Sequence, residues 1–154
     1  MDVYMARALE LAREAADEDE VPVGAVVVND ATGEIIGEGR NRREGDRDPL
    51  AHAELLAIGA ASRTLGGWRL TGCTLYVTLE PCPMCCGAII NARFDRVVFA
   101  AGDPKGGACG SVVDLFALPF NHRPEVVRDV MAEESAALLR EFFKKKRRPP
   151  KAAL

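Results

Sequence analysis

Apolar residues recur along the chain with two different spacings, which together predict an α/β fold. Spacings of three and four residues, as at Met5, Leu9 and Ala12, are typical of an amphipathic helix, whereas short β-branched runs are typical of buried strands. Helices are predicted at 2–18, 51–63, 81–93 and 131–145, with a short one near 112–116. Strands are predicted at 21–29, 34–40, 73–79, 96–101 and 125–130.

The order of these elements predicts a three-layer αβα sandwich. Strands that alternate with helices form a sheet with helices on both of its faces. A turn at Gly33 joins the first two strands as an antiparallel hairpin, so the five-stranded sheet should be mixed. We therefore expect one domain over residues 1–143 and a basic C-terminal tail over residues 144–154.

Charge is unevenly distributed along the chain, although the formal net charge of the 154 residues is only −3. Six of the 20 basic residues lie between positions 144 and 151. The rest of the chain has 14 basic and 23 acidic residues, which gives it a net charge of −9. Such a tail is either a solvated terminus that aids solubility or a contact for a phosphate backbone, and both alternatives stay open. The candidate phosphate contacts are Lys144, Lys145, Lys146, Arg147 and Arg148.

The sequence contains no membrane-spanning or secretory pattern. Its longest apolar runs, such as residues 25–28, are far shorter than the ~20 residues that cross a bilayer. The first residues include early acids and no basic start, unlike a signal peptide. We therefore expect a cytoplasmic protein with no membrane partner, whose five cysteines stay reduced. Reduced thiols favour a metal-binding or redox role over disulfides.

Three of the cysteines lie within five positions, at Cys82, Cys85 and Cys86. They and His52 each lie where a strand or loop leads into a predicted helix, whose first turn offers free N–H groups and the positive end of a dipole. Zinc takes nitrogen and sulfur ligands in a tetrahedron, and a catalytic site keeps one position for water. His52 with two cysteines would supply three ligands. Spacing alone does not decide between Cys85 and Cys86, because both can share a helix face with Cys82.

Glu54 is the candidate general acid and base. On a regular helix it would point away from His52, two residues earlier, so it is a poor additional ligand. A carboxylate beside an activated water can instead accept and return protons. Each motif alone has a simpler explanation, because a CxxC pair is often redox-active or merely buried and a His–Glu pair is common at helix starts.

Together, the segments HAE at 52–54 and PCPMC at 81–85 resemble the H-x-E…P-C-x-x-C signature of zinc deaminases. The chain is similar over nearly its whole length to the cytidine deaminase superfamily, from VPVGAVVV through HAELLA and LYVTLEPCPMCCGAII to ALLREFF. The loop DPKGGACGS at 103–111 and the run NHR at 121–123 resemble the bacterial tRNA-specific adenosine deaminases within it.

This resemblance implies a cytidine deaminase-like fold, a homodimer and one Zn²⁺ per subunit. It implies a hydrolase acting on the C–N bond of a cyclic amidine, which uses a zinc-activated water to convert the wobble adenosine of an arginine tRNA with an ACG anticodon to inosine. The implied partner is the tRNA anticodon stem-loop, with no nucleotide cofactor. The implied residues are the metal ligands His52, Cys82 and Cys85, the proton shuttle Glu54, and the substrate contacts Asn41, Ala53, Asp103 and Lys105.

In this family Asn41 resembles the residue that hydrogen-bonds the flipped base, and Asp103 resembles one that meets a ribose hydroxyl. Backbone N–H groups near Ala53 and Cys82 are expected to help position the base or the metal-bound water. Cys86 and Cys109 depart from the family pattern, and Cys86 is expected to be a packed small residue.

Three alternative functions stay open from the sequence. A deaminase of free guanine, cytosine or cytidine would share the zinc site, but it leaves the basic tail and the NHR run unexplained. A non-catalytic zinc or RNA-binding subunit would not require Glu54. A CxxC redox protein leaves both His52 and Glu54 without a role.

Overall fold

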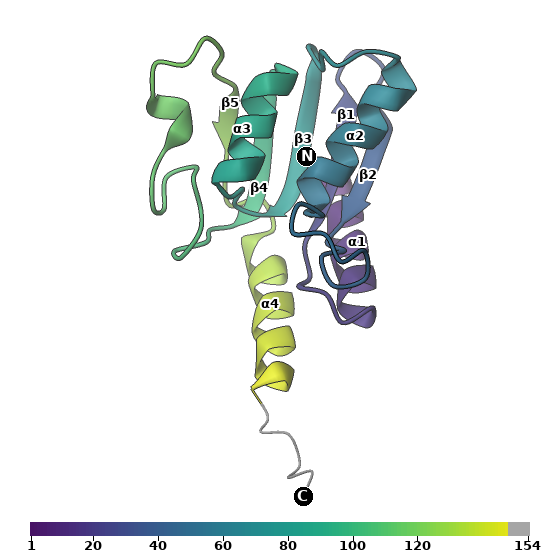
Figure 1. Ribbon diagram of the computed structural model, residues 1–154, viewed down its shortest axis with the longest axis vertical. Coiled ribbons are helices and arrows are strands. Elements are labelled where there is room, and N and C mark those ends of the chain that lie inside the picture. The colour runs from purple at the N-terminus through teal and green to yellow at the C-terminus, as the bar shows by residue number, and fades with distance from the viewer. Residues whose placement is uncertain (148–154) are drawn as a thin grey trace, which may run out of the picture.

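The computed structural model describes residues 1–147 and contains five strands, which form a single sheet (Figure 1). They are β1 (Gly24–Asn29), β2 (Glu34–Arg40), β3 (Cys73–Leu79), β4 (Arg96–Ala101) and β5 (Glu125–Val127). Their order in the sheet is β2-β1-β3-β4-β5. β1 is antiparallel to both β2 and β3, whereas β3, β4 and β5 run parallel, so the predicted mixed sheet is confirmed.

Helices cover both faces of this sheet. α1 (Asp2–Asp17) and α4 (Ala132–Lys146) pack on one face, and α2 (Ala53–Leu65) and α3 (Pro83–Ala92) pack on the other (Figure 1). A short 3₁₀ helix, η1 (Leu115–Ala117), lies between β4 and β5. Successive side chains of β1 point to opposite faces of the sheet. Val26 and Val28 therefore pack in the core beneath α1, and Val27 packs in the core beneath α2 and α3. Within residues 1–147 no helix is long and apolar enough to cross a bilayer.

Several element boundaries differ from the predictions; α2, for example, spans 53–65 in place of 51–63. Three of the differences have local reasons. α3 begins at Pro83 and not at residue 81, because Cys82 keeps an extended backbone (φ −76°, ψ 173°), the conformation favoured before a proline. β1 begins at Gly24 because the Val23 N–H donates to the carbonyl of Val21 in a tight turn. β5 ends at Val127, since Asp129 has a φ of 65°, which cannot continue a strand.

Two glycines of β2 allow α2 to lie directly against the sheet. A Cβ atom added at Gly39 would lie 2.3 Å from the carbonyl oxygen of Ala53, and one added at Gly37 would lie 2.4 Å from that of Ala57. Both contacts are with helix backbone, which cannot move aside as a flexible side chain can. The sequence spacing of these glycines therefore sets the position of the α2 N-terminus, where His52 and Glu54 lie.

We expect Gly39→Ala to destabilise the fold by about 1–3 kcal/mol, because the added methyl group must push α2 away from the sheet. The matched control is Gly87→Ala in α3, where an added Cβ meets no atom within 4 Å. Because alanine is the better helix former, this control should gain up to about 1 kcal/mol. Denaturant unfolding of both variants measures the difference. Equal stabilities would show that the close β2–α2 approach does not limit the fold.

Candidate active site

Three predicted metal ligands converge between the start of α2 and the start of α3. The ligand atoms of His52, Cys82 and Cys85 all lie within 4.8 Å of one another. The Nδ1 atom of His52 is 3.7 Å from the Cys82 sulfur and 3.6 Å from the Cys85 sulfur. A tetrahedral zinc site with ordinary Zn–S and Zn–N bonds has N–S edges of about 3.6 Å. The spacing of the three side chains therefore fits a zinc ion without rearrangement.

The two sulfurs also have the proton chemistry of a metal-binding pair. A hydrogen bond from the Cys85 thiol lowers the pKa of Cys82 to about 4, although burial opposes this effect. The same contact, together with burial, raises the pKa of Cys85 well above its usual range. The two pKa values shift in opposite directions because the Cys85 thiol donates its proton to the Cys82 sulfur. A divalent cation that binds both thiolates would replace that proton.

Glu54 lies beside this cluster in the first turn of α2. Its side chain is 4% exposed, and burial raises the pKa of its carboxyl group. His52 is the residue immediately before the helix and has an extended backbone, so the two side chains do not follow the angular offset of a regular helix. Both line the same pocket. This places a buried carboxyl group next to the candidate metal ligands.

Asn41 connects the loop after β2 to the α2 N-terminus. Its Oδ1 atom accepts a 2.8 Å hydrogen bond from the backbone N–H of Ala53, which leaves the side-chain NH₂ group as the donor available to the pocket that Asn41 lines. The N–H of Ala53 itself is thus bonded to Asn41, and Ala53 is fully buried.

We expect Asn41→Asp to retain the fold and lose affinity for a base, because aspartate still accepts from Ala53 N–H but offers the pocket no amide donor. A lost hydrogen bond to a buried base should raise KM by about tenfold. Asn41→Ala, which also leaves the Ala53 N–H unbonded, should in addition lower the free energy of unfolding by about 1–3 kcal/mol. Steady-state kinetics and denaturant unfolding separate these effects, and an unchanged KM in both variants would remove Asn41 from the binding site.

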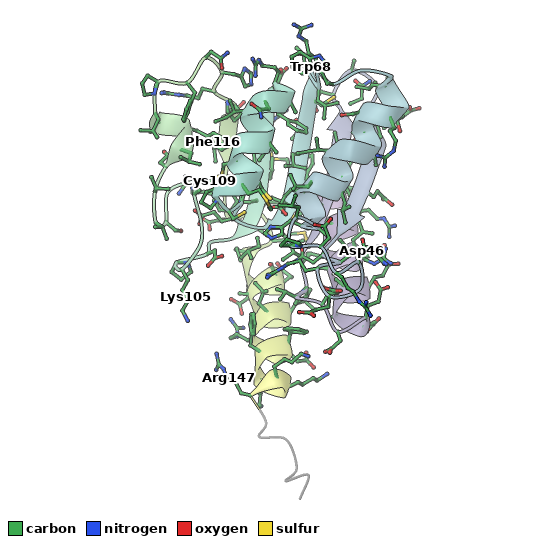
Figure 2. The ribbon with its side chains drawn as sticks, in the orientation of Figure 1. Asp46, Trp68, Lys105, Cys109, Phe116 and Arg147 are labelled. Carbon is green, nitrogen blue, oxygen red and sulfur yellow. The ribbon has the colours of Figure 1, made fainter. Side chains whose placement is uncertain are left out.

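The pocket over these residues has a volume of about 560 Å³ and is closed on one side by α4. Leu139, Phe143 and Arg147 of that helix line it, together with Arg43 from the loop after β2. Phe143 is 41% exposed and forms part of the pocket wall. Arg147 and Lys105 project from the same end of the molecule, opposite the end that carries Trp68 (Figure 2).

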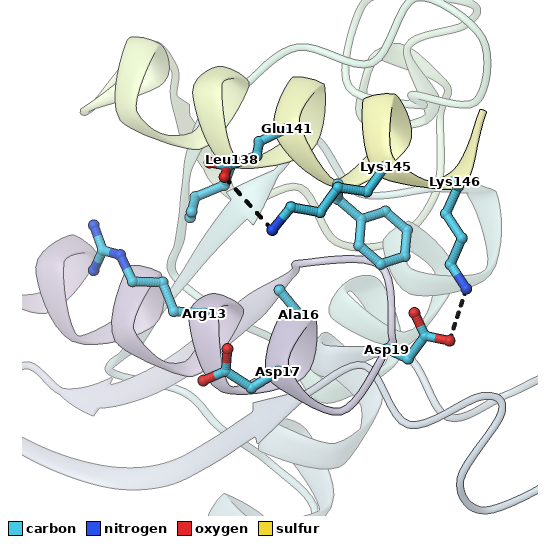
Figure 3. A pocket seen from close by; sticks show the side chains of 9 residues that line it. Arg13, Ala16, Asp17, Asp19, Leu138, Glu141, Lys145 and Lys146 are labelled. Carbon is cyan, nitrogen blue, oxygen red and sulfur yellow. Dashed lines mark hydrogen bonds and ion pairs between the residues drawn. The ribbon is translucent and has the colours of Figure 1, made fainter. Parts of the chain in front are cut away.

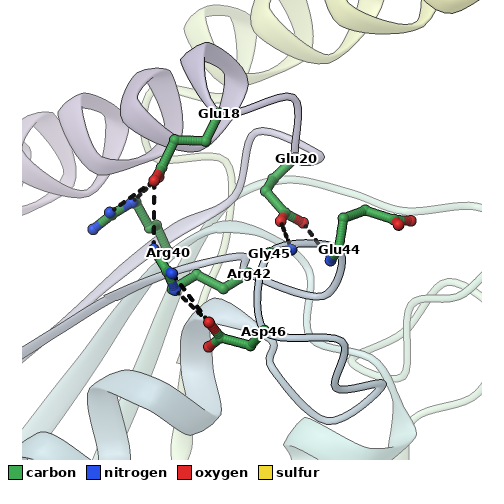
Figure 4. Close-up of polar contacts among 7 residues, drawn as sticks. All are labelled: Glu18, Glu20, Arg40, Arg42, Glu44, Gly45 and Asp46. Atoms are coloured by element: carbon green, nitrogen blue, oxygen red, sulfur yellow. Dashed lines mark hydrogen bonds and ion pairs between the residues drawn. The ribbon is translucent and has the colours of Figure 1, made fainter.

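The loop after β2 is held by a buried carboxylate, Glu20, which no sequence motif indicated. Glu20 is 4% exposed and accepts hydrogen bonds from the backbone N–H groups of Glu44 (3.1 Å) and Gly45 (2.7 Å) (Figure 4). Arg42 forms an ion pair with Asp46 inside the same loop (3.0 Å) and a second one with Glu18, which connects the loop to the end of α1 (3.4 Å). These contacts fix the backbone on either side of Arg43.

A second loop, residues 102–111, brings Asp103 and Lys105 to the pocket, as predicted for substrate contacts. The Asp103 Oδ1 atom accepts from the backbone N–H groups of Lys105 (3.1 Å) and Gly106 (3.2 Å). Glu80, which also lines the pocket and is 3% exposed, accepts hydrogen bonds from this loop. Burial raises the pKa of Glu80, but its hydrogen bonds, led by that of Ser111, together lower the pKa by more than burial raises it. The net pKa is therefore below the ordinary value.

Cys86 lies outside the ligand cluster, as expected for a packed small residue. Its sulfur is 3.4 Å from the sulfur of Cys109 and 3.7 Å from the carbonyl oxygen of Pro81. Both cysteines are buried, and burial together with the contact to Cys109 raises the pKa of Cys86. Cys86 therefore joins α3 to the 102–111 loop, while Cys85 faces His52.

The predicted basic tail begins as helix. α4 continues through Lys146. Lys145 pairs with Glu141 within the helix (3.6 Å), and Lys146 pairs with Asp19, beyond the end of α1 (2.7 Å) (Figure 3). Pairs as exposed as these contribute little to stability and leave the lysines able to exchange partners. Arg148 lies outside the described residues.

Comparison with known proteins finds a deaminase family and several deaminases among the similar proteins. The profile of the MafB19-like deaminase family matches residues 1–147. A tRNA-specific adenosine deaminase of Bacillus subtilis (strain 168) is 48% identical over 153 residues, which are 99% of this chain and 94% of that protein.

Solved structures agree with these matches. A structure from a study of A-to-I editing by tRNA:A34 deaminases has a TM-score of 0.87 and 46% identity, over 90% of this chain and 100% of that one. A guanine deaminase from Nitrosomonas europaea has a TM-score of 0.75 and 29% identity, over 92% of this chain and 83% of that one.

Proposed function

The chain belongs to the bacterial tRNA-specific adenosine deaminase family, and on this premise we propose that it hydrolyses the wobble adenosine of an arginine tRNA with an ACG anticodon to inosine. The reaction consumes one water and releases ammonia from C6 of adenine. The observation that carries the proposal is the convergence of His52, Cys82 and Cys85 with Glu54 at one pocket. Three ligands beside a buried carboxyl group suit hydrolysis better than redox chemistry, which needs neither His52 nor Glu54.

Zinc is the proposed metal, one ion per subunit, held by His52, Cys82 and Cys85. When bound, it supplies Lewis acidity that makes a water nucleophilic near neutral pH. Glu54 takes the proton from the attacking water, delivers it to ring N1, and then helps to protonate the departing ammonia. Its buried position favours this role, because burial raises the pKa of its carboxyl group and makes the carboxylate a stronger proton acceptor.

The walls of the pocket are proposed to bind the nucleotide. The free amide of Asn41 donates to the flipped base, Asp103 accepts from a ribose hydroxyl, and Lys105 contacts a phosphate. An anticodon loop suits such a pocket, because its bases are unpaired and can be turned out at low energetic cost.

The cationic residues of α4 are proposed to follow the backbone of the anticodon stem. Lys144, Lys145, Lys146 and Arg147 lie at the end of the helix that forms the pocket wall, so they extend from the site toward the flanking nucleotides. We also propose a homodimer, which the exposed apolar side chains of the 112–120 segment support. They are Val112, Val113, Leu118 and Phe120.

A second candidate is deamination of free guanine, favoured by the likeness to the N. europaea guanine deaminase. Ammonia release from an anticodon stem-loop with an ACG loop should be compared with release from guanine and from cytidine, each at the same concentration. The RNA should be the preferred substrate by kcat/KM. Faster turnover of guanine than of the RNA would replace the proposed function with the second one.

A further inference from the structure

Glu80 joins the metal site to the loop that carries Asp103 and Lys105. It follows β3 and precedes Cys82 by two residues, in an otherwise apolar stretch of the sequence. Its carboxylate is 3% exposed and faces the 102–111 loop, which lies across the sheet end from the ligands. A buried charge of this kind requires several hydrogen-bond donors to offset the loss of its hydration.

All the donors to Glu80 come from the 102–111 loop. Oε1 accepts from the Asp103 N–H at 3.0 Å and from the Ser111 hydroxyl. Oε2 accepts from the N–H groups of Cys109 at 2.9 Å and Ser111 at 3.1 Å. One carboxylate therefore fixes both ends of a ten-residue loop through charge-assisted bonds.

The loop is shaped to admit this carboxylate. A Cβ atom added at Gly107 would lie 2.3 Å from Glu80 Oε2, so only glycine leaves space for it. The Ala108 N–H donates to the carbonyl of Pro81 at 2.8 Å, which ties the loop to the peptide that leads to Cys82. Asp103 in turn uses Oδ1 to hold the N–H of Lys105 at 3.1 Å. The position of the substrate-side residues therefore depends on Glu80.

We infer that Glu80 is a positioning residue for substrate binding, which holds Asp103 and Lys105 at the rim of the pocket without touching the reacting atoms. The inference rests on the proposed function, because the ligand whose binding it controls is the RNA nucleotide. Without the carboxylate, the loop occupies its binding-competent arrangement for a smaller fraction of the time, and apparent affinity falls by that fraction.

The test is Glu80→Gln, which keeps the size of the side chain but turns an amide donor toward backbone donors. Leaving such buried donors unpaired should raise KM for an ACG anticodon stem-loop by about 10- to 100-fold. kcat should stay within about threefold, since bound RNA restores the loop. Glu80→Asp should recover part of the loss, and Ser111→Ala, which removes a single donor, should give a smaller change in the same direction. Zinc content should be unchanged in all three.

A double-mutant cycle separates positioning from general stability. In an Asp103→Ala/Lys105→Ala background, Glu80→Gln should change KM by less than about twofold, because the residues through which it acts are gone. The same large change in KM in both backgrounds would overturn the inference. So would a fall in kcat with KM unchanged, or a lower melting temperature with neither constant changed.

Hydrogen exchange gives a readout that does not need the RNA. Amides of 103–111 should exchange faster in Glu80→Gln than in the unaltered protein. They should be unchanged in Glu38→Gln, a surface control whose partner is Arg7 of α1. If the unaltered protein makes no inosine, the proposed function fails on that ground, and the exchange rates still decide whether Glu80 holds the loop. Unchanged exchange in Glu80→Gln would overturn the inference in either case.

Discussion

Replacing Glu54 with glutamine should lower the deamination rate by about 10²- to 10⁴-fold. Glutamine has the same shape and keeps a hydrogen-bonding group next to the metal ligands, but it cannot accept a proton from water or return one to the leaving ammonia. Because Glu54 is 4% exposed and buried without a required ion pair, the neutral replacement should not unfold the protein. The variant should therefore bind zinc and RNA while turnover is lost.

Single-turnover kinetics with saturating enzyme measures the chemical step directly, and metal analysis of the same sample confirms that zinc is present. Glu38→Gln serves again as the control, since its ion pair with Arg7 lies on the surface between β2 and α1. A Glu54→Gln rate within about tenfold of the control would contradict the assignment of Glu54 as the proton shuttle.

Replacing Cys85 with serine should release zinc and abolish activity. Loss of a partner outside the ligand set commonly lowers metal affinity by about 10- to 100-fold, so loss of a thiolate ligand should lower it by more than about 100-fold. The measurement is zinc content after dialysis against a chelator, with activity recorded before and after zinc is returned.

Cys86→Ala is the matched control, because the two cysteines are adjacent and both are buried. The Cys86 sulfur contacts Cys109 and not His52, so its removal should leave zinc bound and activity in place. Retention of zinc by Cys85→Ser together with loss from Cys86→Ala would reverse the ligand assignment.

The sequence predicts the sheet and the metal ligands because both follow local patterns. Alternating valines specify the two faces of β1, and the cysteine spacing supplies candidate ligands. The choice between Cys85 and Cys86 could not come from helix geometry, because Cys82 precedes α3 with an extended backbone and is not part of its face. The resemblance to zinc deaminases favoured Cys85, and in the structure the Cys85 sulfur lies 3.6 Å from the His52 Nδ1 atom.

The residues that the sequence did not indicate form hydrogen bonds with segments far away along the chain. Glu20 binds a loop more than twenty residues later, and Glu80 binds one at a similar distance, so neither produces a motif at fixed spacing. An acid within the apolar run LYVTLEPC is nevertheless a usable signal, since a buried charge implies a set of donors. The place of Phe143 in the pocket wall could not be predicted, because helical periodicity identifies an apolar face but not whether that face covers a core or a pocket.

The central claim is deamination at one position of one kind of RNA, and sequencing of the product tests it most directly. Full-length arginine tRNA with an ACG anticodon should be incubated with the zinc-loaded protein and with the Glu54→Gln variant, and then reverse-transcribed and sequenced. Inosine is read as guanosine, so we expect an A-to-G change at the wobble position alone, absent from the variant sample. An unchanged wobble adenosine in tRNA treated with the active, zinc-loaded protein would contradict the account.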